Sequence, residues 1–239
     1  MPILYLVSRT QSDLSLIQAP LDGVLFYAII SLHNTKLMAE VQAHGNKYED
    51  HKIKQLTGLS KKQYDKLKKN GYTSPFDLVK DLKVDFDGAI KTTGNNTICC
   101  SDIQRMYGHG DYTLIVGVYN QVNNKKVFHT EYEFYIKKKD FDKLWGNTSA
   151  EKLNEYVDKV KAVEYGKEAQ TEYQKVAEVW KQGVADDNAL FVINPKVDSK
   201  KQRRVQCSLH IDKLIASGID YDSRSIDYTV VSGRRKFNK

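Results

Sequence analysis

The 239-residue sequence has no long apolar run, few prolines and few cysteines. Its longest apolar stretch, residues 23–32, is about half of the roughly 18 residues that a membrane-spanning helix needs. Only 4 Pro and 14 Gly exclude a collagen-like or linker-dominated chain. The opening MPILYLVSRT lacks the basic, apolar and small-residue pattern of a secretory signal. We therefore expect a globular protein with no membrane partner and no secretory leader.

The three cysteines, Cys99, Cys100 and Cys207, do not form a metal-binding or disulfide pattern. Their number is odd and two of them are adjacent, which is typical of a reducing compartment rather than a disulfide framework. The sequence has no CxxC and no Cys/His cluster at the spacing of a structural zinc site. We expect a cytoplasmic protein without zinc.

Basic residues outnumber acidic residues. The sequence has 37 Lys+Arg against 30 Asp+Glu, a formal net charge of +7, and 15 tyrosines. A surplus of this size favours a polyanionic partner, most often nucleic acid, whose surfaces also suit aromatic side chains. Charge alone does not decide this, because many basic proteins bind no nucleic acid.

Hydrophobic periodicity and turn residues predict the order of elements. We expect helices over residues 34–56, 60–70, 97–106 and 149–183, the last interrupted near Gly166. We expect strands over residues 76–79, 84–93, 112–119, 127–136, 190–193 and 205–211. A buried element over residues 21–32 and a basic tail over residues 233–239 complete the pattern, which predicts a single α/β domain over residues 1–239.

The segment over residues 74–106 holds the most informative set of side chains. It contains carboxylates at Asp77, Asp85, Asp87 and Asp102, and a lysine, Lys91, near the end of an expected strand. Phosphodiester hydrolysis uses this mixture, because carboxylates bind Mg²⁺ while a lysine orients water and neutralises developing charge. The segment therefore predicts a site for phosphate chemistry.

This segment resembles the core of the PD-(D/E)xK nuclease superfamily, and most closely type II restriction endonucleases. The resemblance rests on the run DGAIKTT at 87–93, followed by NTI at 96–98 and SDI at 101–103, while SPFD at 74–77 resembles the Pro-Asp element with one residue inserted. It implies a central mixed β-sheet flanked by helices and Mg²⁺-dependent, sequence-specific cleavage of double-stranded DNA by a homodimer. It covers roughly residues 34–136 and 190–211.

The resemblance also implies which residues act. Lys91 and Asp77 match the lysine and the Pro-Asp carboxylate, and Glu49, in GNKYE at 45–49, resembles the helical glutamate that often precedes the nuclease core. The chain departs from the motif at Ala89, where the family has Asp or Glu. Asp102 is the expected substitute, so the implied metal ligands are Asp77 and Asp102, with Asp87 in reserve.

A later segment resembles a strand and loop that touch DNA in such enzymes. It comprises NPKV at 194–197 and QRRVQCS at 202–208. Arginine reads guanine and glutamine reads adenine in the major groove, whereas lysines mostly contact phosphates. The expected DNA-binding residues are Lys196, Lys200, Lys201, Gln202, Arg203, Arg204 and Gln206.

Ordinary structural roles remain open for every one of these residues. Asp77, Asp85 and Asp87 fit turns, Asp102 fits a helix N-cap, and Glu49 and Lys91 fit solvated surface positions; the lysines over residues 61–69 fit a solvated helix face. The alternative functions are a non-catalytic nucleic-acid-binding protein and a structural or interaction protein. Clustered carboxylates favour the nuclease, because they repel phosphate and a pure binder has no need of them.

Overall fold

The computed structural model describes residues 4–10, 13–18, 46–69, 74–163, 170–197 and 202–231. The chain divides into two compact units, Met1–His44 and Gly45–Lys239, and each is described by itself. In the first unit, β1 (Leu4–Thr10) and β2 (Asp13–Gln18) form an antiparallel pair that was not expected. The expected elements over residues 21–32 and 233–239 lie outside the described residues, and the single domain over residues 1–239 stays a prediction.

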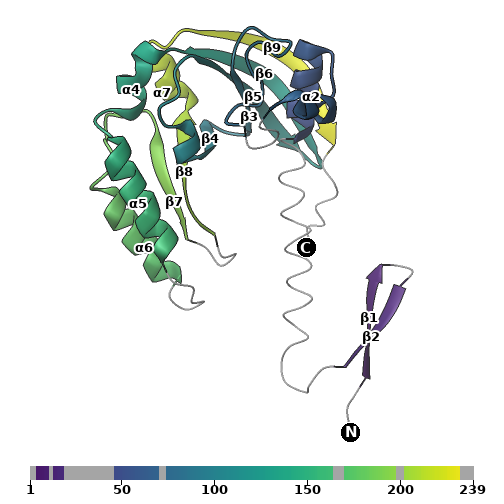
Figure 1. Ribbon diagram of the computed structural model, residues 1–239. Coiled ribbons are helices and arrows are strands. Elements are labelled where there is room, and N and C mark those ends of the chain that lie inside the picture. Colours follow the sequence, from purple (N-terminus) through teal and green to yellow (C-terminus); the bar gives the residue numbers. More distant parts are fainter. Residues whose placement is uncertain are drawn as a thin grey trace. The chain divides into compact units, whose positions relative to one another are not determined.

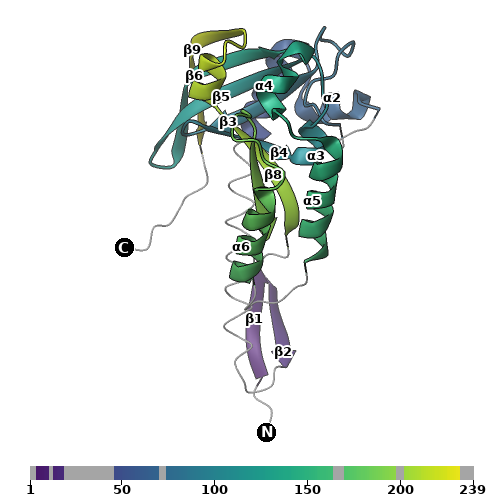
Figure 2. The ribbon, with the colours of Figure 1, turned by 90° about the vertical axis from the view of Figure 1, so that its left-hand side faces the viewer.

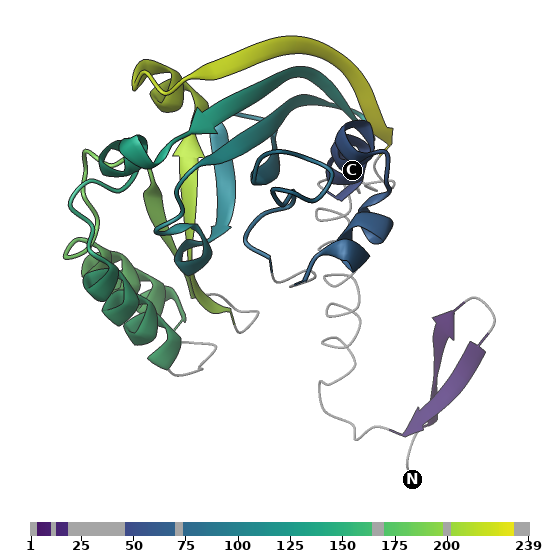
Figure 3. The same ribbon diagram turned by 45° about the horizontal axis from the view of Figure 1, so that its top comes forward.

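The second unit is built on a mixed four-stranded sheet in the order β3-β5-β6-β9. Its strands are β3 (Gly88–Thr93), β5 (Tyr112–Val122), β6 (Lys125–Ile136) and β9 (Tyr221–Val231). β3 is parallel to β5, and the other pairs are antiparallel. Figure 3 shows the long curved strands side by side, with the yellow β9 at the edge. The strands expected over 112–119 and 127–136 are confirmed, whereas β9 was not expected.

A second, antiparallel sheet has the order β4-β8-β7. Its strands are β4 (Thr97–Asp102), β8 (Arg203–His210) and β7 (Val192–Val197). The helix expected over 97–106 is wrong, because β4 is followed only by the short helix α3 (Ile103–Met106). The reason is two-residue alternation: Ile98 and Cys100 are buried, whereas Thr97 and Cys99 are exposed and β4 pairs with β8.

Two groups of helices flank the sheets. Residues 46–57 are helical, and α2 (Lys61–Leu67) follows with a capping box between Ser60 and Gln63. The remaining helical elements are η2 (Lys138–Asp140), α4 (Phe141–Trp145), α5 (Ala150–Ala162), α6 (Gln170–Lys181) and α7 (Ile211–Ala216). Figures 1 and 2 show α5 and α6 beside β7 and β8, at the far end of the unit from α2. The helices expected near 60–70 and over 149–183 are confirmed.

The four-stranded sheet packs against an apolar cluster on each of its faces. Ile90 and Ile115 face a cluster formed with Tyr48, Tyr64 and Phe128, beneath the helix over residues 46–57 and α2. The opposite face, which includes Ala89, Leu114 and Val116, joins the larger core beneath the second sheet and helices α3 to α7. The second unit is thus a mixed α/β unit whose four-stranded and three-stranded sheets are flanked by helices. Within the described ranges, no helix is long and apolar enough to span a membrane.

Candidate active site

Asp77 and Lys91 meet beside strand β3. An isolated antiparallel bridge joins Leu78 to Gly88, and the Asp77 N–H donates to the Gly88 carbonyl at 2.8 Å. This pairing brings the Asp77 carboxylate over the strand, where its Oδ2 accepts from the Ile90 N–H at 2.7 Å and from Lys91 Nζ at 3.1 Å. The two side chains that define the expected motif therefore share a site.

The Lys91 side chain reaches the edge of the apolar interior and is partly exposed to solvent. Ala89, two residues earlier on the same face, is fully buried within the larger core, whereas the Lys91 side chain is 17% exposed. A carboxylate at position 89 would be buried in an apolar cluster, at a high desolvation cost. The departure from the family motif at Ala89 therefore has a local packing reason.

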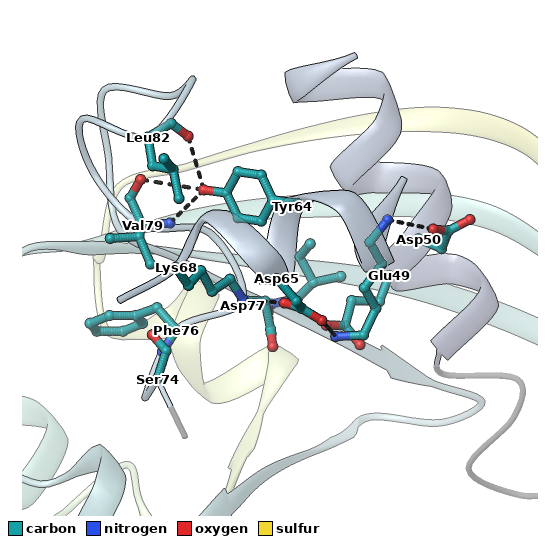
Figure 4. Close-up of polar contacts among 12 residues, drawn as sticks. Glu49, Asp50, Tyr64, Asp65, Lys68, Ser74, Phe76, Asp77, Val79 and Leu82 are labelled. Carbon is teal, nitrogen blue, oxygen red and sulfur yellow. Dashed lines mark hydrogen bonds and ion pairs between the residues drawn. The ribbon is translucent and has the colours of Figure 1, made fainter. Parts of the chain in front are cut away.

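Glu49 joins the same site from the helix over residues 46–57. Its Oε1 accepts from Lys61 Nζ, at the start of α2, at 2.6 Å. Lys61 Nζ also lies 3.3 Å from Asp65, and Lys68 Nζ lies 2.9 Å from Asp65. Figure 4 shows Glu49, Asp65 and Asp77 gathered in one region with Lys68 beside them. Lys61 and Lys68 therefore do not belong to the solvated helix face that the sequence allowed.

Electrostatics couple Glu49 to Asp77. Burial and the charge of Asp77 raise the pKa of Glu49 to about 7, although Lys61 and Lys91 oppose the rise. Burial also acts to raise the pKa of Asp77, but the charge of Lys91 and the hydrogen bond from Ile90 outweigh it and lower that pKa. The pKa of Lys91 is raised, because the negative charge of Asp77 raises it by more than burial lowers it. At neutral pH an ionised Asp77 and a protonated Lys91 stand beside a carboxyl group poised near its midpoint.

A buried charge network anchors the helix that carries Glu49. Glu131 on β6 is 2% exposed and accepts hydrogen bonds from Tyr48, Lys52 and Arg224. The Tyr48 ring lies directly over Gly117, where an added Cβ would sit 2.4 Å from Tyr48 Cζ. Sequence reasoning missed these supporting residues, because no local pattern connects positions 48, 117, 131 and 224.

Tyr64 ties α2 to the segment that follows Asp77. Its hydroxyl accepts from the Val79 N–H at 3.0 Å and donates to the Leu82 carbonyl at 3.0 Å (Figure 4). The Lys61 N–H, at the start of α2, donates to Asp50 at 2.6 Å. These bonds fix α2 against both the Glu49 helix and the Asp77 segment.

The other proposed carboxylates make local contacts instead. Asp102 caps α3, where it accepts from the Gln104 N–H at 3.0 Å, and Asp87 accepts from the Lys80 N–H at 2.9 Å. Within the described part of the chain, no hydrogen bond or ion pair joins Asp102 or Asp87 to Glu49, Asp77 or Lys91. Their roles as metal ligands stay predictions, and the geometry favours Glu49 as the partner of Asp77.

The site suits a cation that needs few protein ligands. Across the described residues, no three His, Cys, Asp or Glu side chains gather as a metal-binding group. Glu49 and Asp77, 13% and 25% exposed, nevertheless offer two carboxylates to solvent. Mg²⁺ is commonly bound by one or two carboxylates together with waters and substrate phosphate. The donor set therefore fits Mg²⁺ and does not fit a fully protein-ligated metal.

Lys196, Arg204 and Gln206 of the predicted DNA-binding segment lie on one face of the second sheet. Cross-strand partners share a face, so the register groups one set of residues into what we call the polar sheet face, on which Ser208 is buried: Thr97, Cys99, Asp102, Val192, Asn194, Lys196, Arg204, Gln206, Ser208 and His210. Lys196 and Arg204 are exposed and directly opposite one another. The edge strand β4 contacts β3, which carries Lys91.

The remaining predicted DNA contacts fall elsewhere. Arg203 pairs with the buried Val197 on the inner face, and its Nη1 donates to the Lys161 carbonyl at 3.0 Å. Gln202 precedes the strand and is partly exposed. Lys200 and Lys201 lie outside the described residues. The geometry therefore favours Arg204 and Gln206 over Arg203 as the side chains that reach a ligand.

Comparison with known proteins adds no relative: no family model, curated protein or solved structure matches the chain. The family resemblance therefore rests on the sequence motifs alone and stays a prediction.

Proposed function

We propose that the protein is a Mg²⁺-dependent endonuclease of the type II restriction class, with a restriction-endonuclease-like fold, acting on double-stranded DNA. The observation that carries the proposal is the convergence of Glu49, Asp77 and Lys91 at one partly exposed site. Glu49 comes from the helix over residues 46–57, whereas Asp77 and Lys91 come from the segment over residues 74–106. Two carboxylates beside a lysine are the groups that phosphodiester hydrolysis uses.

Each side chain has a defined task in this proposal. Glu49 and Asp77 would hold Mg²⁺, which when bound polarises the phosphate and makes water more acidic. Lys91, kept protonated by Asp77, places a positive charge beside the scissile phosphate and orients the attacking water. The hydrogen bond from the Ile90 N–H fixes the Asp77 carboxylate, so the site is organised before substrate arrives.

DNA is the proposed substrate because of the basic surface. The net charge is +7, and Lys196 and Arg204 stand opposite each other on the polar sheet face. Like charges directly across a strand pair destabilise a sheet unless an anion neutralises them. Gln206 lies opposite Asn194 in the next pair of the same face and offers an amide that suits a base edge, whereas Asn194 Nδ2 donates to the Val192 carbonyl and to Ser208 Oγ.

A homodimer and a cytoplasmic location belong to the same proposal. Palindromic sites are most simply cut by two-fold dimers, in which one active site faces each strand. The exposed Val176, Val179 and Trp180 of α6 support an interface on the helical stretch over 149–183. The three cysteines are free thiols, in keeping with a reducing compartment.

Incubation of the protein with plasmid DNA, in Mg²⁺ or in a chelator, tests the function. The nuclease yields discrete fragments in Mg²⁺ alone. Binding without cleavage under both conditions would instead favour the alternative, a non-catalytic nucleic-acid-binding protein. A strict monomer in sedimentation, with and without DNA, would contradict the dimer.

A further inference from the structure

We propose that Lys61 is a displaceable counter-ion of the metal site: it holds Glu49 in the metal-free protein and transfers to Asp65 when a divalent cation binds. This inference rests on the proposed function, because it takes Glu49 and Asp77 as the cation's ligands. It adds a residue that the family resemblance does not assign.

The contacts of Lys61 already span both positions. Its Nζ lies 2.6 Å from Glu49 Oε1 and 3.3 Å from Asp65 Oδ2, one helical turn further along α2. The backbone of Lys61 is fixed, because its N–H donates to Asp50 at 2.6 Å. The long side chain can therefore exchange one carboxylate for the other without any movement of α2.

Charge balance gives the exchange a driving force. Glu49, Asp65 and Asp77 face Lys61, Lys68 and Lys91, so the six side chains carry three negative and three positive charges when Glu49 is ionised. A divalent cation on Glu49 and Asp77 adds two positive charges and competes with the Lys61 ammonium for the same carboxylate oxygens. Movement of Lys61 toward Asp65 frees Glu49 and lowers the repulsion.

Asp65 is suited to receive Lys61. It is 26% exposed and is held by Lys68, whose side chain is only 4% exposed. The Lys68 ammonium also lies 5.4 Å from the centroid of the Tyr64 ring. Asp65 is therefore a fixed acceptor, already oriented toward α2's first turn.

Titration of the metal-free protein with Mn²⁺ by calorimetry tests the proposal in a double-mutant cycle of Lys61→Met and Asp65→Asn. Lys61→Met removes the competing ammonium, so Mn²⁺ should bind about fivefold to tenfold more tightly. Lys62→Met, at the exposed neighbouring position, is the matched control and should bind as wild type does. Circular dichroism melts verify that each variant is folded.

The cycle separates transfer from simple charge effects. With transfer, Asp65→Asn weakens Mn²⁺ binding severalfold when Lys61 is present and leaves it unchanged in the Lys61→Met background. An equal weakening in both backgrounds, or no tightening in Lys61→Met, would overturn the role of Lys61.

Glu49→Gln and Asp77→Asn distinguish this failure from failure of the proposed function. If both variants bind Mn²⁺ as wild type does, or if wild type binds no Mn²⁺, then both the proposed metal site and the Lys61 proposal are wrong. If both variants weaken binding while Lys61→Met does not strengthen it, only the Lys61 proposal is wrong.

Discussion

Lys91 Nζ lies 3.1 Å from Asp77 Oδ2, although the two residues are 14 positions apart in the sequence. The antiparallel bridge between Leu78 and Gly88 folds the intervening segment back, so that Asp77 returns to the start of β3. Asp77 thereby keeps Lys91 charged, while the Ile90 N–H keeps Asp77 in place.

Replacement of Lys91 should separate binding from cleavage. We expect Lys91→Ala to lower the cleavage rate by about two or more orders of magnitude, because it removes the charge that orients water and neutralises the phosphate. DNA affinity, measured by gel shift without Mg²⁺, should change little. Cleavage at the wild-type rate would contradict the assignment of Lys91.

Replacement of the carboxylates should identify the metal ligands. We expect Glu49→Gln and Asp77→Asn each to abolish cleavage and weaken Mg²⁺ binding, since both belong to one site. Asp102→Asn and Asp87→Asn test the ligands implied by the family resemblance. If Asp77→Asn were fully active and Asp87→Asn inactive, the metal site would have to be reassigned to the loop before β3.

The buried Glu131 should govern stability at low pH. Burial acts to raise its pKa, but hydrogen bonds from Tyr48, Lys52 and Arg224 outweigh burial and lower that pKa below its usual value. As pH falls below about 4.5, the unfolded chain takes up the proton first, so the stabilisation present above this pH is lost. Urea unfolding across a pH series measures this.

The matched variant is Glu131→Gln. At neutral pH it should unfold about 3–5 kcal/mol more easily, because Lys52, which is 1% exposed, loses its ionic partner. The difference from wild type should shrink as the pH falls. A difference that is independent of pH would show that Glu131 is not ionised in the folded protein.

Gly117 should not tolerate a side chain. Gly117→Ala would place Cβ 2.4 Å from Tyr48 Cζ, so the Glu49 helix must shift, at a cost of about 1–3 kcal/mol in unfolding free energy. The same shift should lower cleavage. Gly110→Ala is the control, because its nearest neighbour, Lys138 Cβ, would be 3.9 Å away.

The polar sheet face should contribute both affinity and discrimination. We expect Lys196→Ala to weaken binding to all duplexes and to flatten the salt dependence, since lysine contacts phosphate. Gln206→Ala should cost about 1–3 kcal/mol of discrimination at one base position. Lys200→Ala and Lys201→Ala are expected to act as Lys196→Ala does. If the binding curves of these variants on cognate and scrambled duplexes superimpose on those of wild type, the polar sheet face has no role in DNA recognition.

Arg203 and Arg204 offer a test within one dipeptide. The sequence predicts both arginines as DNA contacts, whereas the register places Arg204 on the polar sheet face and Arg203 donates to the Lys161 carbonyl. We expect Arg204→Ala to impair DNA binding and Arg203→Ala to lower stability instead. The reverse pattern, in gel shifts and thermal melts, would contradict this division of roles.

The sequence by itself determined features that depend on neighbouring residues. The Ser60 cap and the turn at Asn123 follow from local backbone and side-chain preferences. The site's Lys91 and Asp77 were found because they lie within one short segment. The helix expected over 97–106 failed because pairing with β8, about 110 residues away, overrides local preference there.

Only the tertiary structure decided which charges meet. Glu49, Asp87 and Asp102 are all candidate carboxylates in the sequence. In the structure, Glu49 lies beside Lys61, and burial and the charge of Asp77 raise the pKa of Glu49, whereas Asp102 caps α3. The network of Glu131 with Tyr48, Lys52 and Arg224 likewise joins three distant segments. The physical reason is that ion pairing depends on separation and burial in space, and both are fixed by how the sheets and helices pack.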